Sequence, residues 1–527
     1  MISGIYQIAR ADFLERIRRR GFLVVIFLTV LFSYIFSPPR NGKYVTLVFD
    51  QYVGLYNSAW MGTSVAISFS VFFSLIGFYF ISKAVDVDRT ARTGQIIAAS
   101  PVGKSKYVLG KYFSNVSILC IIAAITMLSA LIMQLVRGED RTIDLWALAS
   151  PFLFMSLPLI ALISAIAIWF EIIPKLQGTI GNTIYFVIWI VTVFAGAKPI
   201  PMGSYFTFTD PFGRAIPMIS IAASLKEQFP DYNGQFSLGL TFLDEEAQSF
   251  VWHGVNWSWP VIFGRFAWIA ASIIFAWIAS LFFNRFRVKE SRPSAGEQNQ
   301  ATVVMPVEPI AFAADLTFSS SALTLATIKA GRQPFLPLLR GEFKLMMSGY
   351  RIWFLAATML TVLGFILPFG AVERFIWPLS WVWPLAIWSA MGTRERRFRT
   401  EELHFSSPGP ISMQLHATWV AGIILAVLMS SGLAVRLIAE QELTMLAVWI
   451  SGAVFVPTLA LACGVWSRSG KAFEIIYLSI WYMGPLNGLP VLNFMDLSEG
   501  RNVYIYSVLS LIFYVAAILG RRQRLNQ

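Results

Sequence analysis

Long apolar runs, separated by short charged segments, dominate the chain. A helix needs about 20 apolar residues to cross the roughly 30 Å hydrocarbon core of a bilayer. Runs that approach or exceed this length predict about twelve membrane-spanning helices, near residues 21–37, 59–82, 112–136, 147–172, 180–196, 259–284, 351–370, 375–392, 414–436, 443–466, 472–490 and 502–519. Prolines interrupt the eighth and eleventh runs, at Pro378, Pro384, Pro485 and Pro490. The pattern predicts an all-α integral membrane protein.

The first apolar run follows several arginines, as the core of a secretory signal peptide would. It is long and aromatic, however, and it ends at Ser37-Pro38-Pro39 without a small-residue cleavage site. We therefore expect residues 21–37 to be retained as the first span.

The composition excludes an ordinary soluble domain. Of the 527 residues, 56% are hydrophobic and only 13% are charged, whereas soluble domains carry about 25% charged residues. Cys120 and Cys463 lie in separate apolar runs, so a disulfide framework is not indicated. His253, His404 and His416 are too scattered to predict a metal site.

The distribution of basic residues predicts the topology. With the N-terminus in the cytoplasm, 30 of the 41 Lys and Arg residues fall in cytoplasmic segments, and 11 lie outside or near outer helix ends. This bias favours cytoplasmic positions for both termini. The formal net charge of +12 follows mainly from this asymmetry and suits anionic lipid, so it gives no reason to expect a nucleic-acid partner.

Two longer stretches lie between spans. Residues 197–258 are external and rich in Pro, Gly, acidic and aromatic residues, and we expect them to have some structure of their own. Residues 285–338 are predicted to form a cytoplasmic linker. At about 55 residues, this linker is too short for a catalytic domain of ordinary size.

Residues 98–106, AASPVGKSK, end like a phosphate-binding P-loop. The first Gly of that motif is Ala98 here, and Pro101 removes a backbone N–H donor. A P-loop also follows a strand, whereas this segment follows a membrane span. The sequence has no ABC signature such as Leu-Ser-Gly-Gly-Gln either. We therefore expect that the chain itself binds no ATP.

An internal repeat accounts for this segment instead. Residues 88–101, DRTARTGQIIAASP, align without a gap with residues 395–408, ERRFRTEELHFSSP, at an offset of 307. The matched positions are Asp88 with Glu395, Arg89 with Arg396, Arg92 with Arg399, Thr93 with Thr400, Ser100-Pro101 with Ser407-Pro408, and Ser105 with Ser412. The second copy has Pro410-Ile411 in place of Gly103-Lys104, so the repeat does not retain the Gly-Lys-Ser string.

The repeat extends to the start of each half. Arg10-Ala11-Asp12-Phe13 aligns with Arg340-Gly341-Glu342-Phe343, before the first and seventh spans. The chain therefore divides into a first half, 1–284, and a second half, 339–527, joined by the linker. Six spans in each half predict two parallel repeats related by a pseudo-two-fold axis along the membrane normal. Each half begins with a predicted interfacial helix, 1–20 and 339–350, unless these segments only extend the spans.

Each half also carries a predicted cytoplasmic helical hairpin, 83–111 and 393–413. Its Ser-Pro is expected to start the helix that leads into the third or ninth span, with Ser as the N-cap. If the repeated arginines only anchor the chain on the cytoplasmic side of the membrane, they need only their charge. If the hairpins are two docking sites for partner subunits, they need the same residues at equivalent positions. Both interpretations stay open. The docking interpretation involves Asp88, Arg89, Arg92, Thr93, Ser100, Pro101, Glu395, Arg396, Arg399, Thr400, Ser407 and Pro408.

Together these features resemble the type-2 permeases of ABC transporters, in the exporter branch. Those proteins begin with an amphipathic elbow helix, and their coupling hairpin shows a charged run, a Pro and a Gly-Lys before the third span. The run from Asp88 to Thr93, Pro101 and Gly110-Lys111 is similar to that pattern. The second half departs from it, with Ala417-Thr418 in place of Gly110-Lys111. Most members have one six-span unit and dimerise, so this chain resembles a fused, double-length member.

The resemblance implies a permease subunit with no catalytic, cofactor-binding or metal-binding residues of its own. Two ABC ATPase subunits, identical or different, would bind ATP and Mg²⁺ and dock on the two hairpins. An amphipathic or hydrophobic small molecule, lipid or peptide would be exported across the plasma membrane, and we expect a bacterial source.

Two other classes of function stay open. An ion-coupled secondary transporter would need ionisable groups near the membrane centre, whereas Glu171, Arg265, Arg374, Arg436 and Glu474 lie near predicted span edges. A polytopic enzyme acting on lipid would need clustered His, Asp, Glu or Ser at one face of the bilayer. If the chain is such an enzyme, we expect the cluster in the acidic external segment 197–258.

Overall fold

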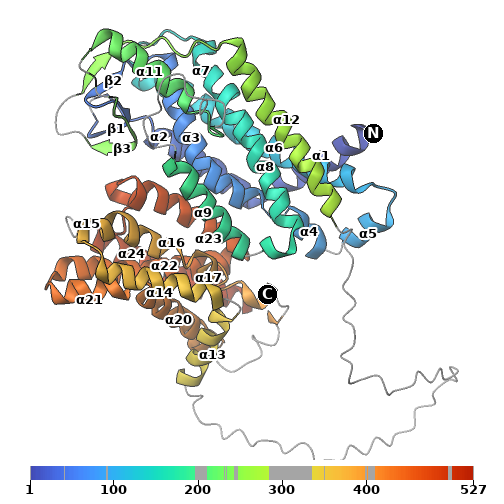
Figure 1. Cartoon of the computed structure of the whole chain (residues 1–527). Helices are drawn as coiled ribbons and strands as arrows, with labels where there is room; N and C mark the ends of the chain where they lie inside the picture. The colour runs from blue at the N-terminus through green and yellow to red at the C-terminus, as the bar shows by residue number, and fades with distance from the viewer. Residues whose placement is uncertain are drawn as a thin grey trace, which may run out of the picture.

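The computed structural model describes residues 2–40, 42–82, 84–90, 93–177, 179–195, 210–230, 232, 234–242, 247–283, 335–348, 351–397, 400–401, 410–495 and 501–525. Its elements are mostly helices, gathered into two groups that follow the two halves of the chain (Figure 1). The strands lie at one end of the first group, and the first hairpin lies at the opposite end (Figure 1).

The first half contains a helix in the predicted interfacial segment, long apolar helices and a helical hairpin between two of them. Its helices are α1 (Ile2–Ile17), α2 (Arg20–Ile35), α3 (Ser58–Ile81), α4 (Ala84–Thr90), α5 (Thr93–Ala99), α6 (Lys104–Arg137), α7 (Leu145–Pro151), η1 (Phe152–Ser156), α8 (Leu157–Ile172), η2 (Pro174–Leu176), α9 (Thr179–Ala195), α11 (Ala215–Gln228) and α12 (Trp259–Phe282). Side-chain caps start two of them, because Asn57 accepts a hydrogen bond from the backbone of Trp60 and Asp144 accepts two at the start of α7.

A small β-containing unit forms from residues 44–54 and from the segment 197–258 that is predicted to be external. β1 (Tyr44–Val48) pairs antiparallel with β3 (Ser237–Phe242), and β2 (Tyr52–Gly54) pairs parallel with β4 (Gln248–Phe250). Buried side chains from both segments and from α11, such as Trp60, Ile221 and Trp252, form its core. The described part of residues 197–258 thus has structure of its own. The contribution of residues 44–54 was not predicted.

The helices of the second half are mostly shorter and more broken than those of the first. These are α13 (Phe335–Met347), α14 (Arg351–Ile366), α15 (Phe369–Ala371), η3 (Val372–Ile376), α16 (Trp377–Val382), α17 (Leu385–Trp388), α18 (Arg394–Arg397), η4 (Pro410–Leu415), α20 (His416–Met429), α21 (Ser431–Ala439), α22 (Leu443–Ser467), α23 (Gly470–Trp481), η5 (Tyr482–Leu486), η6 (Pro490–Leu492) and α24 (Arg501–Leu525). The predicted eighth span breaks at Pro384, and the eleventh passes into a π-helical turn that contains Pro485. Both breaks follow from the missing N–H and the ring of proline.

Six helical segments of the described residues are long and apolar enough to cross a membrane: Ser58–Arg89, Lys104–Arg137, Leu145–Ile172, Trp259–Phe282, Leu443–Ser467 and Asn502–Leu525. The pair Met413–Met429 and Ser431–Ala439, bent by 67°, would make a seventh. Shorter apolar helices, Gly21–Ile35, Ile184–Val193 and Ala357–Ile366, coincide with three further predicted spans. A helical membrane protein is therefore confirmed, while the number twelve stays a prediction.

The start of α6 differs from the expectation for the Ser-Pro pair. Helix α5 ends at Ala99, and Gly103 occupies the N-cap of α6 without a side-chain hydrogen bond. The Ser100 hydroxyl donates to the carbonyl oxygen of Ile97 at 2.7 Å, so it closes the preceding helix instead. The predicted N-cap at Ser100 is wrong. Ser407 and Pro408, its counterparts, lie outside the described residues.

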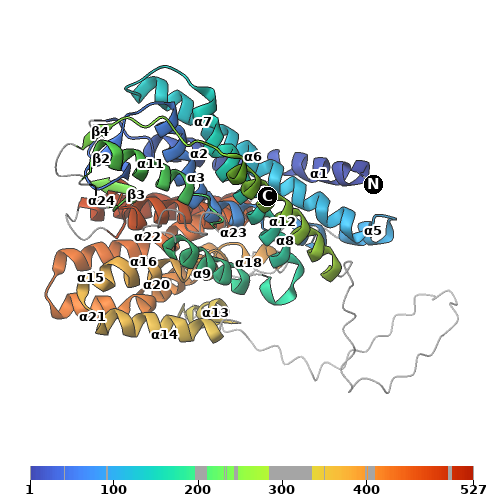
Figure 2. The same ribbon diagram turned by 45° about the horizontal axis from the view of Figure 1, so that its top comes forward.

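The two halves pack directly against each other. Helix α23 of the second half contacts α2 and α3 of the first, and α17 contacts α9. The turned view shows the second half running alongside the first (Figure 2). The second and fifth predicted spans, α3 and α9, therefore lie against the eleventh and eighth, α23 and α17. We call this contact between α3, α9, α16–α17 and α23 the seam.

Candidate functional site

The first hairpin consists of two short helices, α4 and α5, set between the long helices α3 and α6. A helix, α5, precedes residues 100–103 where a P-loop would need a strand. The Ser105 hydroxyl lies 3.1 Å from that of Ser280 on α12, so it contacts another helix of the same half. The geometry of this segment is that of a helical hairpin and not of a phosphate-binding loop.

A buried lysine ties this hairpin to the interfacial helix. The Lys111 ammonium on α6 lies 2.6 Å from the Asp12 carboxylate of α1 and 2.8 Å from the Asp88 carboxylate of α4. The Lys111 side chain is only 5% exposed. One cation therefore joins three elements that are far apart in the sequence, and each carboxylate depends on it.

Further polar groups complete the cluster around Asp12. Arg16 lies 2.9 Å from the Asp12 carboxylate, which also accepts a hydrogen bond from Ser114. Burial would raise the pKa of Asp12, but the charges of Arg16 and Lys111 and the hydrogen bonds outweigh it, so this pKa lies below its ordinary value. Asp12 is therefore ionised at neutral pH. Its share of the stability is lost only as the pH falls through this lowered pKa.

Two more contacts fix α4 from its other sides. The Tyr107 hydroxyl donates to the Asp88 carboxylate at 2.6 Å. At the start of α4, the Glu171 carboxylate from the end of α8 accepts a hydrogen bond from the backbone N–H of Val85. A carboxylate is favourable at a helix N-terminus because unpaired N–H groups point toward it. The hairpin is thus held rigidly by α1, α6 and α8.

The second hairpin is also held by a buried cation, but that cation comes from a different helix. Arg521 of α24, 2% exposed at its side chain, lies 2.9 Å from the Glu395 carboxylate and donates to the Gln414 side chain at 3.2 Å. Position 418, which corresponds to Lys111 at the offset of 307, holds Thr. Arg394 lies 3.9 Å from Glu342 of α13, the counterpart of Asp12. Both hairpins are therefore linked to their interfacial helices through charge pairs.

The repeated threonines make the same hydrogen bond in both halves. The Thr93 hydroxyl donates to the carbonyl oxygen of Asp88 at 3.2 Å, and the Thr400 hydroxyl donates to that of Glu395 at 3.4 Å. Each bond closes the turn that follows the charged helix. The sequence repeat thus corresponds to a repeated local structure.

The repeated arginines that the structure describes point away from these buried clusters. Arg89 is 46% exposed at its side chain and reaches the Gln177 side chain at 3.1 Å. Arg396 is exposed on α18. By contrast, their neighbours Asp88 and Glu395 are directed inward to Lys111 and Arg521.

The remaining predicted docking residues are placed as follows. Thr93 and Pro101 are exposed, and Ser100 is half-buried. Arg92, Arg399, Ser407 and Pro408 lie outside the described residues. Asp12, Glu171 and Arg521 were not predicted to belong to this site. Asp12 could have been suspected, because it interrupts the apolar face of an amphipathic helix, whereas no sequence signal connects Arg521 to Glu395.

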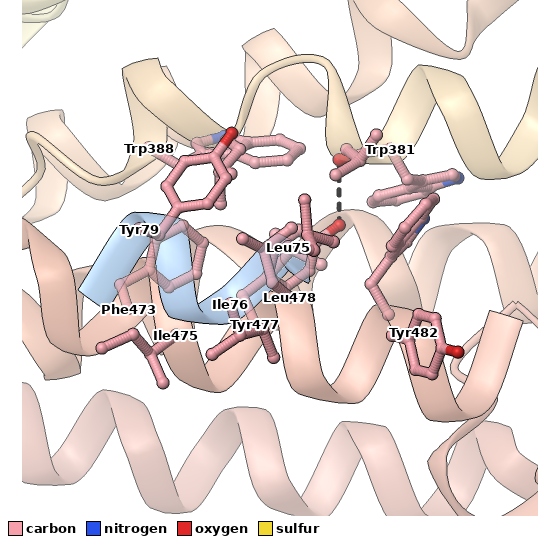
Figure 3. Close-up of a cluster of buried hydrophobic side chains, with 14 of the residues drawn as sticks. Leu75, Ile76, Tyr79, Trp381, Trp388, Phe473, Ile475, Tyr477, Leu478 and Tyr482 are labelled. Carbon is pink, nitrogen blue, oxygen red and sulfur yellow. Dashed lines mark hydrogen bonds between the residues drawn. The ribbon is translucent and has the colours of Figure 1, made fainter. Parts of the chain in front are cut away.

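The seam between the halves is lined by aromatic side chains. Tyr79 and Leu75 of α3 lie beside Trp388, Phe473 and other side chains of the second half (Figure 3). The Tyr482 ring lies 5.0 Å from that of Phe72 and Trp481 lies 5.7 Å from Phe186, as measured between ring centroids. The two halves therefore share one apolar core.

Residues 6–231 match the family model of the ABC-2 family transporter proteins. The match covers α1, the first hairpin and the first-half side of the seam. No curated protein matches the chain.

Proposed function

We propose that both halves of this chain together form the complete permease of an ABC exporter, because residues 6–231 match the family model of the ABC-2 family transporter proteins. A membrane permease of an ABC transporter works with an ABC ATPase. In the proposed assembly, two ATPase subunits, identical or different, dock on the two cytoplasmic hairpins. Each would carry its own ATP and Mg²⁺.

The observation that carries this proposal is the shared construction of the two hairpins. In each, an acidic residue faces a buried cation, a threonine closes the turn, and an arginine next to the acidic residue is exposed. Membrane anchoring alone needs charge and gives no reason for this arrangement. A pair of equivalent docking surfaces does, because two ATPase subunits would present the same groove twice.

The buried charge pairs give the hairpins a mechanical role. A force on α4 reaches α6 and α1 through Lys111, and a force on α18 reaches α24 through Arg521. Buried, hydrogen-bonded ion pairs hold their geometry because separating the charges leaves them uncompensated. Closure of the ATPase subunits would therefore move whole helices and open the seam.

The substrate would cross along the seam, from the cytoplasm outward. Its aromatic lining suits an amphipathic or hydrophobic molecule, whether a small molecule, lipid or peptide. Cytoplasmic termini and a bacterial plasma membrane complete the proposal, and they agree with the excess of Lys and Arg in the segments assigned to the cytoplasm.

Replacing Arg89 and Arg396 by lysine tests the docking surfaces. Lysine keeps the charge but cannot make the forked hydrogen bonds of a guanidinium group. We expect Arg89→Lys and Arg396→Lys each to weaken association with the ATPase by roughly 1–3 kcal/mol, measured by co-purification and by transport-coupled ATP hydrolysis. The corresponding variants at the next repeated arginines, Arg92→Lys and Arg399→Lys, are expected to behave in the same way.

The control for this experiment is Arg141→Lys, in the predicted external loop between α6 and α7. It should assemble and hydrolyse ATP like the parent, and all variants should insert normally. If the hairpin variants also match the parent, the repeated arginines are only topological anchors.

A further inference from the structure

Among the described residues, a single carboxylate lies in the seam between the two halves. Glu474 of α23 is 4% exposed, and it lines a small pocket with Tyr79 and Phe186 of the first half and Trp383 of the second. Within the described part of the chain, its carboxylate makes no hydrogen bond or ion pair. The two other buried glutamates of the described residues have partners, because Glu171 accepts a backbone N–H and Glu342 lies 3.9 Å from Arg394.

A buried carboxylate without a partner is costly, because burial removes its hydration. Proteins normally offset this cost with a cation or with hydrogen-bond donors. In the seam, none of the described residues donates a hydrogen bond to the Glu474 carboxylate or forms an ion pair with it, so a cationic ligand that enters when the halves separate would compensate its charge.

The rest of the pocket indicates the kind of ligand. Three aromatic residues, Tyr79, Phe186 and Trp383, line the same space as the carboxylate. Aromatic faces attract cations, and they also cover apolar groups. The remaining lining residues are Val382, Leu385 and Ala386, which are apolar, and Asn182, which is polar and uncharged. Charge and surface together suit a cation that is mostly hydrophobic.

A metal ion fits this pocket poorly. Calcium takes about 6–8 oxygen ligands, and zinc usually takes four protein ligands. Glu474 is the one carboxylate among the pocket residues, and the described residues contain no group of three or more His, Cys, Asp or Glu that could hold a metal.

The pocket also lies where a cytoplasmic substrate would first meet the seam. Glu474 is in the first turns of α23, and Tyr79 is near the end of α3. One turn before Glu474, Lys471 donates to the carbonyl oxygen of Phe80 at 3.3 Å and to that of Ser82. These bonds close the seam between the pocket and the predicted cytoplasmic side.

In this closed arrangement the pocket has a volume of only about 20 Å³, which is room for about one water molecule. A substrate can therefore reach Glu474 only when α3 and α23 move apart. That movement would also break the contacts of Lys471.

We propose that Glu474 makes the permease selective for lipophilic organic cations, which it binds at the cytoplasmic end of the seam. This inference rests on the proposed function, since it names the substrate class of the proposed export path. A cation of this class gives the carboxylate a counter-charge and the aromatic rings a cation–π partner. An anion of the same size is repelled.

Binding of two ions of similar shape and opposite charge tests this proposal. The full chain, without ATPase, is placed in lipid nanodiscs, and binding of radiolabelled tetraphenylphosphonium is measured above that of empty nanodiscs. We expect saturable binding of tetraphenylphosphonium. Tetraphenylborate should displace the labelled ion at least about 100-fold more weakly than unlabelled tetraphenylphosphonium does. We expect Glu474→Gln to weaken binding by about tenfold or more, the range of a lost buried charge contact.

Two further variants separate charge from folding. Glu474→Asp keeps the charge and should bind more tightly than Glu474→Gln. Glu442→Gln, at an exposed carboxylate on the other side of the second half, should bind like the parent. The proposal is overturned if the parent shows no saturable binding, if it binds both ions equally, or if Glu474→Gln binds like the parent.

The parent measurements decide the question even if Glu474→Gln does not fold. Because no ATPase is present, failure here would refute the cation site and leave the docking of ATPase subunits to be judged by the arginine variants.

Discussion

Lys111→Met is expected to detach both the interfacial helix α1 and the first hairpin from the third span. In the described part of the chain, Lys111 is the one cation that contacts both Asp12 and Asp88, at 2.6 and 2.8 Å. All three side chains are largely buried. Methionine fills a similar volume but leaves two carboxylates facing each other without their shared cation. Breaking a buried pair in this way typically costs about 3–5 kcal/mol.

Hydrogen–deuterium exchange of the purified chain measures this loss locally. A local cost of this size should accelerate exchange of the amides of α1 and α4 by about 100-fold or more. Lys104→Met, at an exposed position seven residues earlier on the same helix, should leave exchange unchanged. Parent-like exchange in Lys111→Met would show that the cluster does not hold the hairpin.

A double variant tests whether the charges act together. Asp12→Asn removes one of the two carboxylates that Lys111 compensates, so its effect should be less than additive with that of Lys111→Met. Strict additivity would mean that the two residues stabilise the hairpin independently.

Arg521→Met is expected to have the second largest effect, on the other hairpin. It removes the guanidinium group 2.9 Å from Glu395 and its hydrogen bond to Gln414, in surroundings that leave the Arg521 side chain 2% exposed. We expect a local cost of about 3 kcal/mol. Faster amide exchange in α18 and at the end of α24 would report it, and Arg522→Met, at the exposed neighbouring position, is the control.

The internal repeat suggests a rescue of this variant. Thr418 occupies the position that Lys111 has in the first half, and it lies on α20, the counterpart of α6. Adding Thr418→Lys to Arg521→Met should therefore restore part of the lost protection, because the new ammonium group can take the role that Lys111 has toward Asp88. No restoration would indicate that the two hairpins are built differently despite their shared sequence.

The sequence is sufficient to predict the helices, because long apolar runs and prolines act locally. The first hairpin follows from its charged run and its position between two spans. The Ser-Pro signal misleads, since the Ser100 hydroxyl has a second acceptor within reach, the Ile97 carbonyl oxygen, and local patterns do not decide between two such acceptors.

The connections that hold the site together could not be predicted in the same way. The Asp12–Lys111 and Glu395–Arg521 pairs join positions about 100 or more residues apart, and only tertiary packing brings them together. The seam is a similar case. Glu474 was predicted near the edge of a span, but its burial between the two halves depends on how α3 and α23 pack.

The composition of the assembled transporter tests the central proposal most directly. Native mass spectrometry of the chain, purified with its partners from the cells that produce it, gives the number of copies of each subunit. Two fused permease halves predict one copy of this chain with two ABC ATPase polypeptides, identical or different. Two copies of the chain with two ATPase polypeptides, or a chain that carries none, would contradict the account.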